Sequence, residues 1–171
     1  MFEIGDYIIY GNNGVCKVVD IGPIQLDNSK SSKLYYTLEP IFENGSKVYT
    51  PVGNKKVLMR PVISEEEAID LIDSIPDIEY DSELTGKERE QKMKESLKSI
   101  DTEEWIKILK ALYHTKEERL ADGKSLTSSD EKYLKATQEW LYGELSVSLD
   151  KSIEEIEDYV LNRIIESELA N

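Results

Sequence analysis

The sequence has one histidine and one cysteine, and this scarcity limits the chemistry that the chain can perform. Cys16 has no second thiol with which to form an internal disulfide. His114 lies far along the chain from Cys16, so the two do not suggest a nucleophile paired with its base. No cluster of histidine, cysteine and carboxylate residues has the spacing of a metal site. The pattern therefore points to no catalytic residue, no metal ligand and no cofactor.

Long apolar runs and positive charge are also missing. The longest apolar runs, such as residues 7–10, are far too short to cross a membrane, so we expect no membrane partner. The first residues lack the basic and apolar regions of a signal peptide, and we therefore expect a cytoplasmic protein. Lys and Arg number 21 against 35 Asp and Glu, for a net charge of −14. This excess argues against a protein that coats nucleic acid without specificity.

The composition of the chain changes near residue 61. Residues 1–60 carry seven basic and six acidic residues, whereas residues 61–171 carry 14 basic and 29 acidic residues. Short β-type segments occupy the first part, and helical periodicity occupies the second. A chain of 171 residues is long enough for two small domains. We therefore expect a β domain at residues 1–60 and an acidic helical domain at residues 61–171, each with its own binding surface.

Residues 1–60 contain short segments of apolar and β-branched residues separated by Gly, Asn and Pro. Residues 43–46 include the Asn-Gly pair that is favoured in tight hairpins. Because neighbouring residues of a strand point to opposite faces, we expect one of Tyr35 and Tyr36 inside and the other outside. The pattern predicts a small antiparallel β-barrel of the SH3 or Tudor type. Its strands are expected at residues 6–10, 15–21, 34–38, 47–51 and 57–60.

Residues 61–171 predict an all-α module of five helices, which makes the expected fold class α+β. Ser64 with Glu67, and Asp101 with Glu104, have the spacing of capping boxes at helix starts. Pro76 is expected to end the first helix. The two tryptophans occupy apolar stripe positions, where core packing is the expected role. The later helices are expected at residues 86–99, from 101 to about 121, from 127 or 128, and from about 152.

The helix expected at residues 86–99 is an exception within the acidic half. It has five basic residues against three acidic ones over residues 87–98. Lys87, Lys94 and Lys98 fall near one side of this helix. That side can contact phosphates. It can also be a solvated face with ion pairs such as Glu90 with Lys94, and charge alone favours this second interpretation.

Tyrosines are frequent in the β half of the chain. An exposed tyrosine such as Tyr49, beside an open sheet edge, would suit a partner that adds a strand to that edge. Ordinary packing of β-prone residues explains the tyrosines equally well. An open edge can also pair with a second copy of the chain, so both a monomer and a strand-exchanged dimer remain open.

Several segments, in order, resemble the CarD family of bacterial transcription regulators, whose N-terminal domain also occurs in the transcription–repair coupling factor. In the β half these are residues 5–10 (Gly-Asp-Tyr-Ile-Ile-Tyr), 14–15 (Gly-Val), 35–38 (Tyr-Tyr-Thr-Leu) and 48–51 (Val-Tyr-Thr-Pro). In the helical half they are residues 126–131 (Leu-Thr-Ser-Ser-Asp-Glu) and 143–145 (Gly-Glu-Leu). No single motif is specific, but their order and spacing are.

The resemblance implies a non-enzymatic regulator with two contacts. The Tudor-like barrel would bind the β subunit of bacterial RNA polymerase by strand pairing, through residues Ile24, Lys47, Val48, Tyr49, Thr50 and Pro51. The helical domain would contact promoter DNA and modulate the stability of the open complex, through residues Arg89, Lys92, Lys94 and Lys98. Family members insert a Trp into the minor groove. In this chain that position falls at or near Arg89.

Two alternatives remain open at this stage. In the first, the chain binds the polymerase but serves as a protein–protein adapter, with an acidic helical surface that recruits or excludes another protein. In the second, a carboxylate pair among residues 65–67 or 154–158 performs acid–base catalysis, which would require a pocket with a strongly raised carboxyl pKa. These acidic clusters also fit the starts of helices, where the helix dipole favours negative charge.

Overall fold

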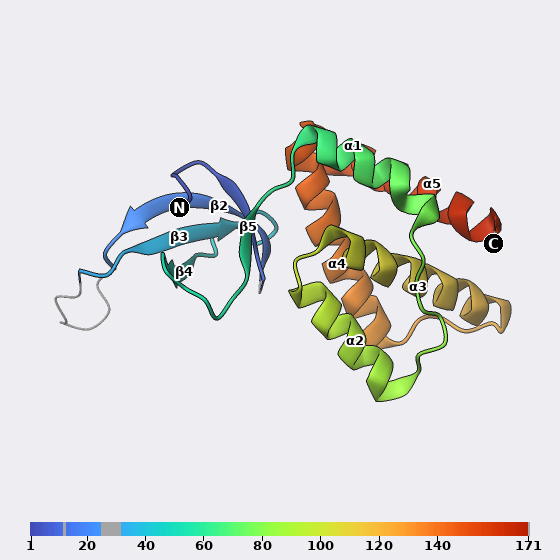
Figure 1. Ribbon diagram of the computed structural model, residues 1–171. Coiled ribbons are helices and arrows are strands. Elements are labelled where there is room, and N and C mark those ends of the chain that lie inside the picture. The colour runs from blue at the N-terminus through green and yellow to red at the C-terminus, as the bar shows by residue number, and fades with distance from the viewer. Residues whose placement is uncertain (12, 25–31, 171) are drawn as a thin grey trace. The chain divides into compact units, whose positions relative to one another are not determined.

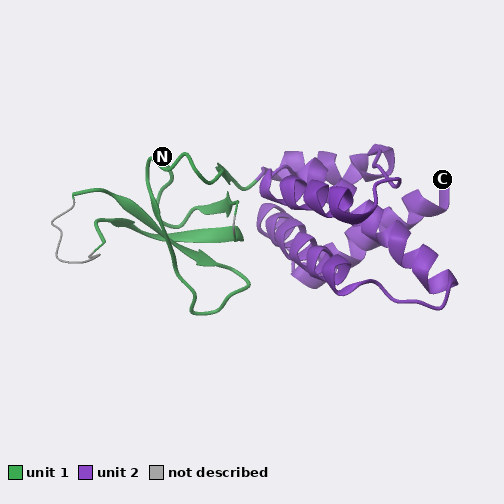
Figure 2. Ribbon diagram, turned by 90° about the horizontal axis from the view of Figure 1, so that it is seen from below, with its two compact units in different colours: residues 1–62 green, residues 63–171 purple. Residues whose placement is uncertain are grey.

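The computed structural model describes residues 1–11, 13–24 and 32–170 (Figure 1). In these residues an antiparallel five-stranded sheet precedes five α-helices and one short 3₁₀ helix, which confirms the α+β class. The chain divides into two compact units, residues 1–62 and residues 63–171 (Figure 2). The sheet lies in the first unit, and all the helices lie in the second.

The strands pair in the order β4-β3-β2-β1-β5, and every neighbouring pair is antiparallel. Each strand begins and ends within two residues of its predicted bounds. The turn from β1 to β2 returns at Gly14, whose φ of 70° is a conformation that glycine adopts without steric cost. The strands are β1 (Tyr7–Tyr10), β2 (Gly14–Gly22), β3 (Tyr35–Pro40), β4 (Val48–Pro51) and β5 (Met59–Pro61).

The sheet is open rather than a closed barrel. Among the described residues, β4 pairs only with β3, and β5 pairs only with β1, so both are edge strands. The predicted closure is therefore not confirmed. Both edge strands are short, and β4 ends at Pro51, which has no backbone N–H to donate to a further strand. Short edge strands and edge prolines commonly limit the pairing of a sheet with further strands.

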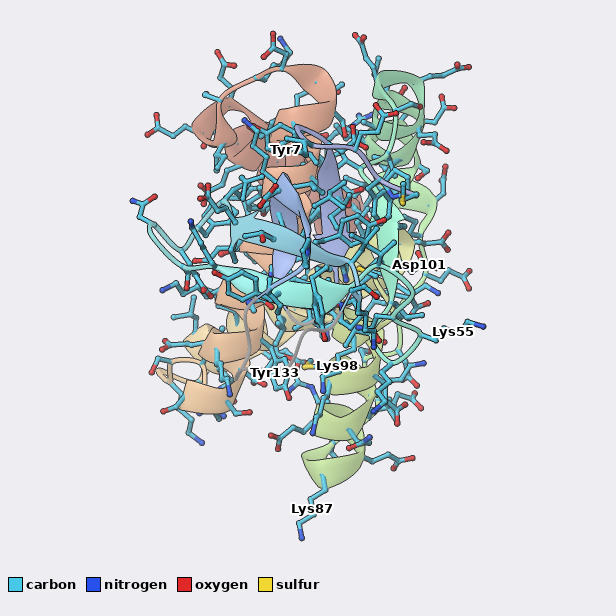
Figure 3. The ribbon with its side chains drawn as sticks, turned by 90° about the vertical axis from the view of Figure 1, so that its left-hand side faces the viewer. Tyr7, Lys55, Lys87, Lys98, Asp101 and Tyr133 are labelled. Atoms are coloured by element: carbon cyan, nitrogen blue, oxygen red, sulfur yellow. The ribbon has the colours of Figure 1, made fainter. Side chains whose placement is uncertain are left out.

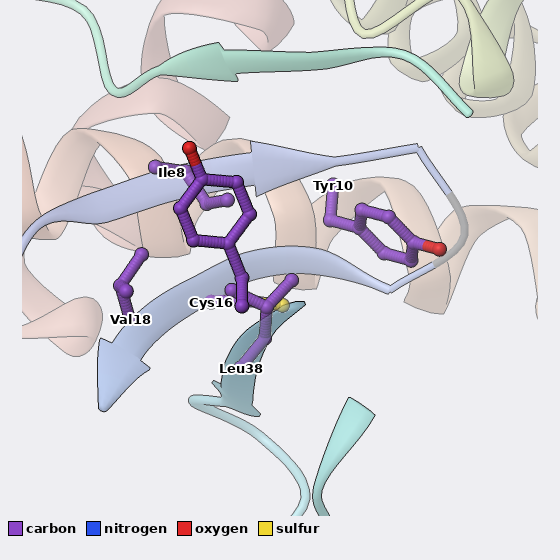
Figure 4. Packing of buried hydrophobic residues seen from close by; sticks show 6 residues of the cluster. Ile8, Tyr10, Cys16, Val18 and Leu38 are labelled. Carbon is purple, nitrogen blue, oxygen red and sulfur yellow. The ribbon is translucent and has the colours of Figure 1, made fainter. Parts of the chain in front are cut away.

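One face of the sheet carries the core of the first unit, which Figure 4 shows from close by. Its buried residues alternate along β1, β2 and β3, as the two-residue period of a strand requires. They are Ile8, Tyr10, Cys16, Val18, Tyr36 and Leu38. Tyr36 is buried and Tyr35 is half-buried, in agreement with the predicted alternation. The Tyr36 hydroxyl accepts the Phe2 N–H at 3.1 Å and so ties the N-terminus to this core.

The second unit consists of helices joined by short connections. Their bounds are α1 (Glu65–Ser74), the 3₁₀ helix η1 (Ile75–Asp77), α2 (Gly86–Lys98), α3 (Thr102–Ala121), α4 (Ser128–Leu149) and α5 (Ile153–Ala170). The first α-helix ends at Ser74, shortly before Pro76, as predicted. Pro76 lies in the first turn of η1, where the missing N–H of proline costs nothing.

Local capping sets most of the helix starts. The predicted box at Ser64 is present: its hydroxyl accepts the Glu67 N–H at 3.1 Å, and the Glu67 carboxylate accepts the Ser64 N–H at 2.8 Å. Asp101 caps α3 as expected, but the reciprocal bond predicted for Glu104 is wrong. The Glu104 carboxylate instead accepts a hydrogen bond from Lys107 at 2.8 Å, one turn further along the same helix. That ion pair draws it away from the cap.

The core of the second unit forms where α2, α3 and α4 meet. Trp105 is fully buried, and its ring lies edge-on to Trp140 with centroids 5.8 Å apart. The Trp105 indole N–H donates to the Leu97 carbonyl at 3.1 Å, which fixes the end of α2 against α3. Met93 packs in a cluster with Ile108. None of the described helices is both long and apolar enough to span a membrane.

Candidate functional surfaces

The outer edge of β4 has no partner strand in the described part of the chain. Its inner edge pairs with β3, with Tyr36 opposite Thr50 and Thr37 opposite Tyr49. The strand predicted at residues 47–51 for strand pairing is therefore an edge strand, except that Lys47 lies just before it. A free edge presents unpaired N–H and C=O groups to a further strand.

The direction of each backbone group in β4 follows from one hydrogen bond. The Val52 N–H donates to the Leu34 carbonyl of the β3 side at 3.0 Å. Backbone groups alternate along an antiparallel strand, so those of Thr50 also face β3, whereas those of Tyr49 and Pro51 face outward. Because proline lacks an N–H, Tyr49 carries the one outward backbone donor within β4. It also presents an outward carbonyl.

Side chains along β4 alternate between the core and solvent. The Tyr49 side chain is 51% exposed, whereas Thr50 is buried and its hydroxyl accepts the Asn54 side-chain N–H at 2.9 Å. Val48 packs against the sheet core. The interaction between Asn54 and Thr50 supports the edge from the side of the following turn. Tyr49 is thus the residue of β4 whose side chain and backbone groups are both available to a partner.

The remaining residues predicted for this contact lie at opposite ends of β4. Gly22 pairs with Tyr35, which in turn pairs with Pro51, so these residues lie at the same end of the sheet. Ile24 follows β2 at that end, two residues after Gly22. Ile24 is half-buried. Lys47 is exposed and precedes Val48 at the other end of the strand. Residues 25–31, which continue the loop beyond Ile24, are outside the described residues.

Arg89 of α2 points into the helical unit. One guanidinium nitrogen lies 2.5 Å from the Asp130 carboxylate of α4, and the other donates to the Thr115 hydroxyl of α3 at 3.2 Å. Both side chains of the ion pair are mostly buried, with 20% of Arg89 and 9% of Asp130 exposed. Arg89 therefore connects three helices, and its charge is already paired within the chain.

The lysines of α2 divide between two sides of the helix. Lys92 follows the same side as Arg89 and lines a cavity with Glu104. The hydrogen bond from Lys107 is the main cause of the lowered Glu104 pKa, and the positive charge of Lys92 lowers that pKa by a smaller amount. Lys94 and Lys98 are exposed about half a turn away, on the side that also carries Lys87.

Figure 3 shows Lys87 extending from the N-terminal end of α2, with Lys98 at the other end of the helix. No carboxylate of the described residues forms an ion pair with Lys87, Lys94 or Lys98. The four residues predicted for DNA contact therefore do not form one surface. Lys94 and Lys98 share an open, basic side with Lys87, whereas Arg89 points into the unit and Lys92 is exposed at the cavity on the other side of α2.

The cavity beside Lys92 has a volume of about 710 Å³ and lies between the 79–84 segment, α2 and α3. Its lining mixes acidic residues such as Asp81 and Glu83 with basic ones such as Lys107. Within the part of the chain that the structure describes, no group of three or more His, Cys, Asp or Glu side chains is arranged to hold a metal ion. The carboxyl pKa shift found here, at Glu104, is downward, which is opposite to the shift a general acid requires.

The acidic clusters considered for acid–base catalysis occupy helix starts. Glu67 caps the Ser64 N–H, and the Glu155 carboxylate accepts the Ser152 N–H at 3.3 Å in the same manner at the start of α5. Both glutamates are exposed. These contacts explain the clusters as capping groups, which the helix dipole also favours.

Two polar clusters of the helical unit were missed at the sequence level. Lys110 is buried, and its ammonium group donates to the Ile78 carbonyl at 2.9 Å and to the Ser167 hydroxyl at 2.8 Å. Burial lowers the Lys110 pKa. The Tyr80 hydroxyl donates to Glu168 at 2.6 Å. The position of Lys110 beside Leu109, on an apolar stripe of the helix, could have indicated that Lys110 is buried. Its partners Ile78 and Ser167 could not be identified, because they lie far from Lys110 in the sequence.

The sequence was compared with models of known protein families. The family model described as CarD-like/TRCF RID domain matches residues 2–63. This range covers the whole five-stranded sheet, including β4. No curated protein matches the chain.

Proposed function

We propose that this chain, whose residues 2–63 belong to the CarD-like/TRCF RID domain family, is a transcription regulator that binds the β subunit of RNA polymerase through the open edge of β4. The domain itself indicates an interaction with RNA polymerase. The partner would place the chain in the cytoplasm, and the proposed role requires no catalytic step and no cofactor.

The observation that carries this proposal is the outer edge of β4, which no other described strand of the matched domain pairs with. Addition of a strand gains affinity from main-chain hydrogen bonds, and it gains specificity from side chains that alternate along the strand. Tyr49 supplies an outward N–H, an outward carbonyl and an exposed ring at the same position. Pro51 supplies only an acceptor, which limits how far a partner strand can extend its ladder.

The test compares two substitutions at Tyr49 in the full chain, with binding to purified RNA polymerase measured by biolayer interferometry. Tyr49→Ala keeps the backbone N–H and removes the ring, whereas Tyr49→Pro removes the N–H as well. Proline is tolerated at an edge position whose N–H faces outward. We expect Tyr49→Pro to weaken binding roughly 30-fold, since it costs about 2 kcal/mol by removing a hydrogen bond and leaving the partner's carbonyl unpaired.

Tyr49→Ala should weaken polymerase binding by less than Tyr49→Pro if main-chain pairing carries the contact. Tyr7→Ala is the matched control, because Tyr7 is also an exposed tyrosine of the sheet but lies on β1, between two strands. Equal binding by the Tyr49→Pro chain and the unchanged chain, with the sheet intact by circular dichroism, would refute strand addition at β4.

For the helical unit, we infer that the open side of α2 contacts promoter DNA and prolongs the life of the open complex. Lys94 and Lys98 are the predicted contact residues that lie on the open side of α2 beside Lys87, and neither forms an ion pair with a described carboxylate. Such lysines add affinity through phosphates and the release of counterions, without sequence readout. Arg89 and Lys92 stay predictions from the resemblance. The ion pair of Arg89 with Asp130 supports a role within the unit, whereas Lys92 is exposed on the other side of α2 from Lys94.

The promoter-contact proposal is tested by the double variant Lys94→Glu with Lys98→Glu. We expect shorter open-complex lifetimes and a salt-dependence slope reduced by about two, because two phosphate contacts are lost. Polymerase affinity should be unchanged. Lys124→Glu with Lys132→Glu, at exposed positions of the turn before α4 and of α4 itself, makes the same change of charge elsewhere. Lifetimes that respond equally to this control pair would remove the case for α2.

A further inference from the structure

A groove with a volume of about 470 Å³ lies between α1 and α5 and is closed at one side by the connection from α4 to α5. We call it the α1–α5 groove. Apolar side chains form its base, contributed by Ile72, Leu149 and Ile156. This volume lies within the range of roughly 300–1,000 Å³ that is typical of binding sites. The groove is separate from α2 and from the sheet, and neither proposed contact uses it.

Two large apolar side chains on the walls of the α1–α5 groove remain open to solvent. Ile69 of α1 is 47% exposed, and Tyr159 of α5 is 48% exposed. Single exposed apolar residues are ordinary, but these two line the same groove and adjoin its apolar base. The Asp73 carboxylate of α1 accepts a hydrogen bond from Arg163 of α5 at 3.2 Å, which joins the two walls and keeps the groove in shape.

The surroundings of the groove are strongly acidic. Helices α1 and α5 together carry eleven Asp and Glu residues and one basic residue, Arg163. Of the groove's own rim, Glu65, Asp73 and Glu155 are acidic, and Lys151 is basic. A surface with this field attracts positively charged partners and repels acidic ones. It is also a poor match for a second copy of the same unit, which carries the same negative charge.

The walls of the groove are helices, whose backbone groups are already paired, so a partner cannot bind there by adding a strand. Of the common modes of segment binding, an amphipathic helix that lays its apolar face in the groove best fits an apolar base between two helices. We propose that the α1–α5 groove binds a protein segment of this kind, with aliphatic side chains between Ile69 and Tyr159 and with Lys or Arg at its margins. This binding does not depend on the contacts proposed for β4 and α2.

The test uses the full chain and a labelled synthetic peptide of about 14 residues, with Leu on one helical face and Lys on the other. Fluorescence anisotropy measures its affinity. A second peptide keeps the Leu positions and replaces every Lys by Glu. We expect saturable binding of the Lys peptide that weakens as salt is raised, because surface charge attraction is screened. The Glu peptide should bind at least about tenfold more weakly.

Variants then locate the site of binding. Ile69→Ser combined with Tyr159→Ser should weaken the Lys peptide about tenfold, because exposed anchors on the groove walls are lost while the buried base is kept. Leu120→Ser is the matched control, since Leu120 is 58% exposed on α3 and lies outside the groove. It should leave affinity unchanged. Circular dichroism checks that each variant retains its helices.

Four results would overturn the proposal. The first is the absence of saturable binding, and the second is equal binding of the Lys and Glu peptides. The third is a loss of affinity on Leu120→Ser as large as that on the groove variants, which would mean adsorption to the acidic surface at large. A concentration-dependent dimer that the Ile69→Ser variant abolishes would also overturn it, because the occupant would then be a second copy of the chain.

Discussion

Arg89 offers the sharpest test of how this helical unit is built. Its guanidinium is bound to Asp130 and Thr115, so the structure predicts that Arg89 stabilises the unit. Replacing Arg89 by Met keeps much of the apolar stem and removes the charge. The Asp130 carboxylate, only 9% exposed, would then lose its counter-charge. An unpaired charge in such a position is far more costly than a lost surface ion pair.

The magnitude follows from the exposure of the two partners. Breaking a fully buried ion pair by removing one member costs about 3–5 kcal/mol. Here Arg89 is 20% exposed, and Asp130 lies in the first turn of α4, where the helix dipole returns about 0.3–1 kcal/mol to a carboxylate. The lost bond to Thr115 adds about 1 kcal/mol. Because both side chains are partly exposed, solvent screening reduces this total, and we expect Arg89→Met to lower the free energy of unfolding by about 2–3 kcal/mol.

The assay is urea unfolding followed by far-ultraviolet circular dichroism, which reports the helices of the second unit. Lys94→Met is the matched control on the same helix, and it should change the free energy by less than about 0.5 kcal/mol, as exposed positions usually do. Asp130→Asn alone and together with Arg89→Met completes a double-mutant cycle. We expect a coupling of about 1–3 kcal/mol between the two positions.

An unchanged unfolding midpoint for Arg89→Met, or a coupling near zero, would refute this reasoning. The side chain would then be free for another role. If the same variant also shortened open-complex lifetimes while Lys94→Glu with Lys98→Glu did not, Arg89 rather than the open side of α2 would be the DNA contact.

Three further predictions concern Cys16, Ser64 and Trp105. Burial raises the Cys16 pKa from 9.0 to about 12, with a smaller effect of Glu43. The folded thiol then stays protonated while the unfolded thiol ionises, so the unfolding free energy should fall between pH 9.0 and about 12, by at most about 1.4 kcal/mol per pH unit. Urea titrations at several pH values should show this slope, and Cys16→Ala should show a shallower one, because buried tyrosines such as Tyr142 still contribute; identical slopes would contradict the burial of the thiol. Ser64→Ala removes the cap that accepts the Glu67 N–H and should cost about 1 kcal/mol in a thermal melt, whereas Ser82→Ala, at an exposed loop position, should cost almost nothing. Trp105→Ala should lower the free energy of unfolding by about 3–5 kcal/mol, measured by urea unfolding, because a fully buried indole and its hydrogen bond to Leu97 are removed. A loss below about 1 kcal/mol would be inconsistent with that burial.

Some features of the fold could be read directly from neighbouring residues. The box of Ser64 and Glu67 depends on a three-residue spacing, and the structure contains both of its hydrogen bonds. The alternation of Tyr35 and Tyr36 depends only on the strand period. The same kind of reasoning failed at Glu104, where Lys107 on the next turn competes for the carboxylate. Spacing identifies a possible cap, but it does not say which of two nearby partners is preferred.

The candidate surfaces were less predictable because they depend on distant residues. Arg89 and Lys94 look alike in a count of charge on α2. They differ because Arg89 shares the helix side of Met93, which is buried, and because Asp130 lies opposite it, 41 positions away. The helical period could have suggested that Arg89 faces inward, but the acceptor could not be identified from the sequence.

For this protein, the order of residues was sufficient to predict an α+β chain with short strands first and capped helices after them. Turns, caps and periodicity involve residues within a few positions, so their energetics are local. The pairing order decided that β4 has a free edge and that the sheet stays open, and packing decided which charges of α2 face solvent and that α1 and α5 enclose an apolar groove. These outcomes come from hydrogen bonds and burial between residues that are far apart in the chain and meet only when it folds.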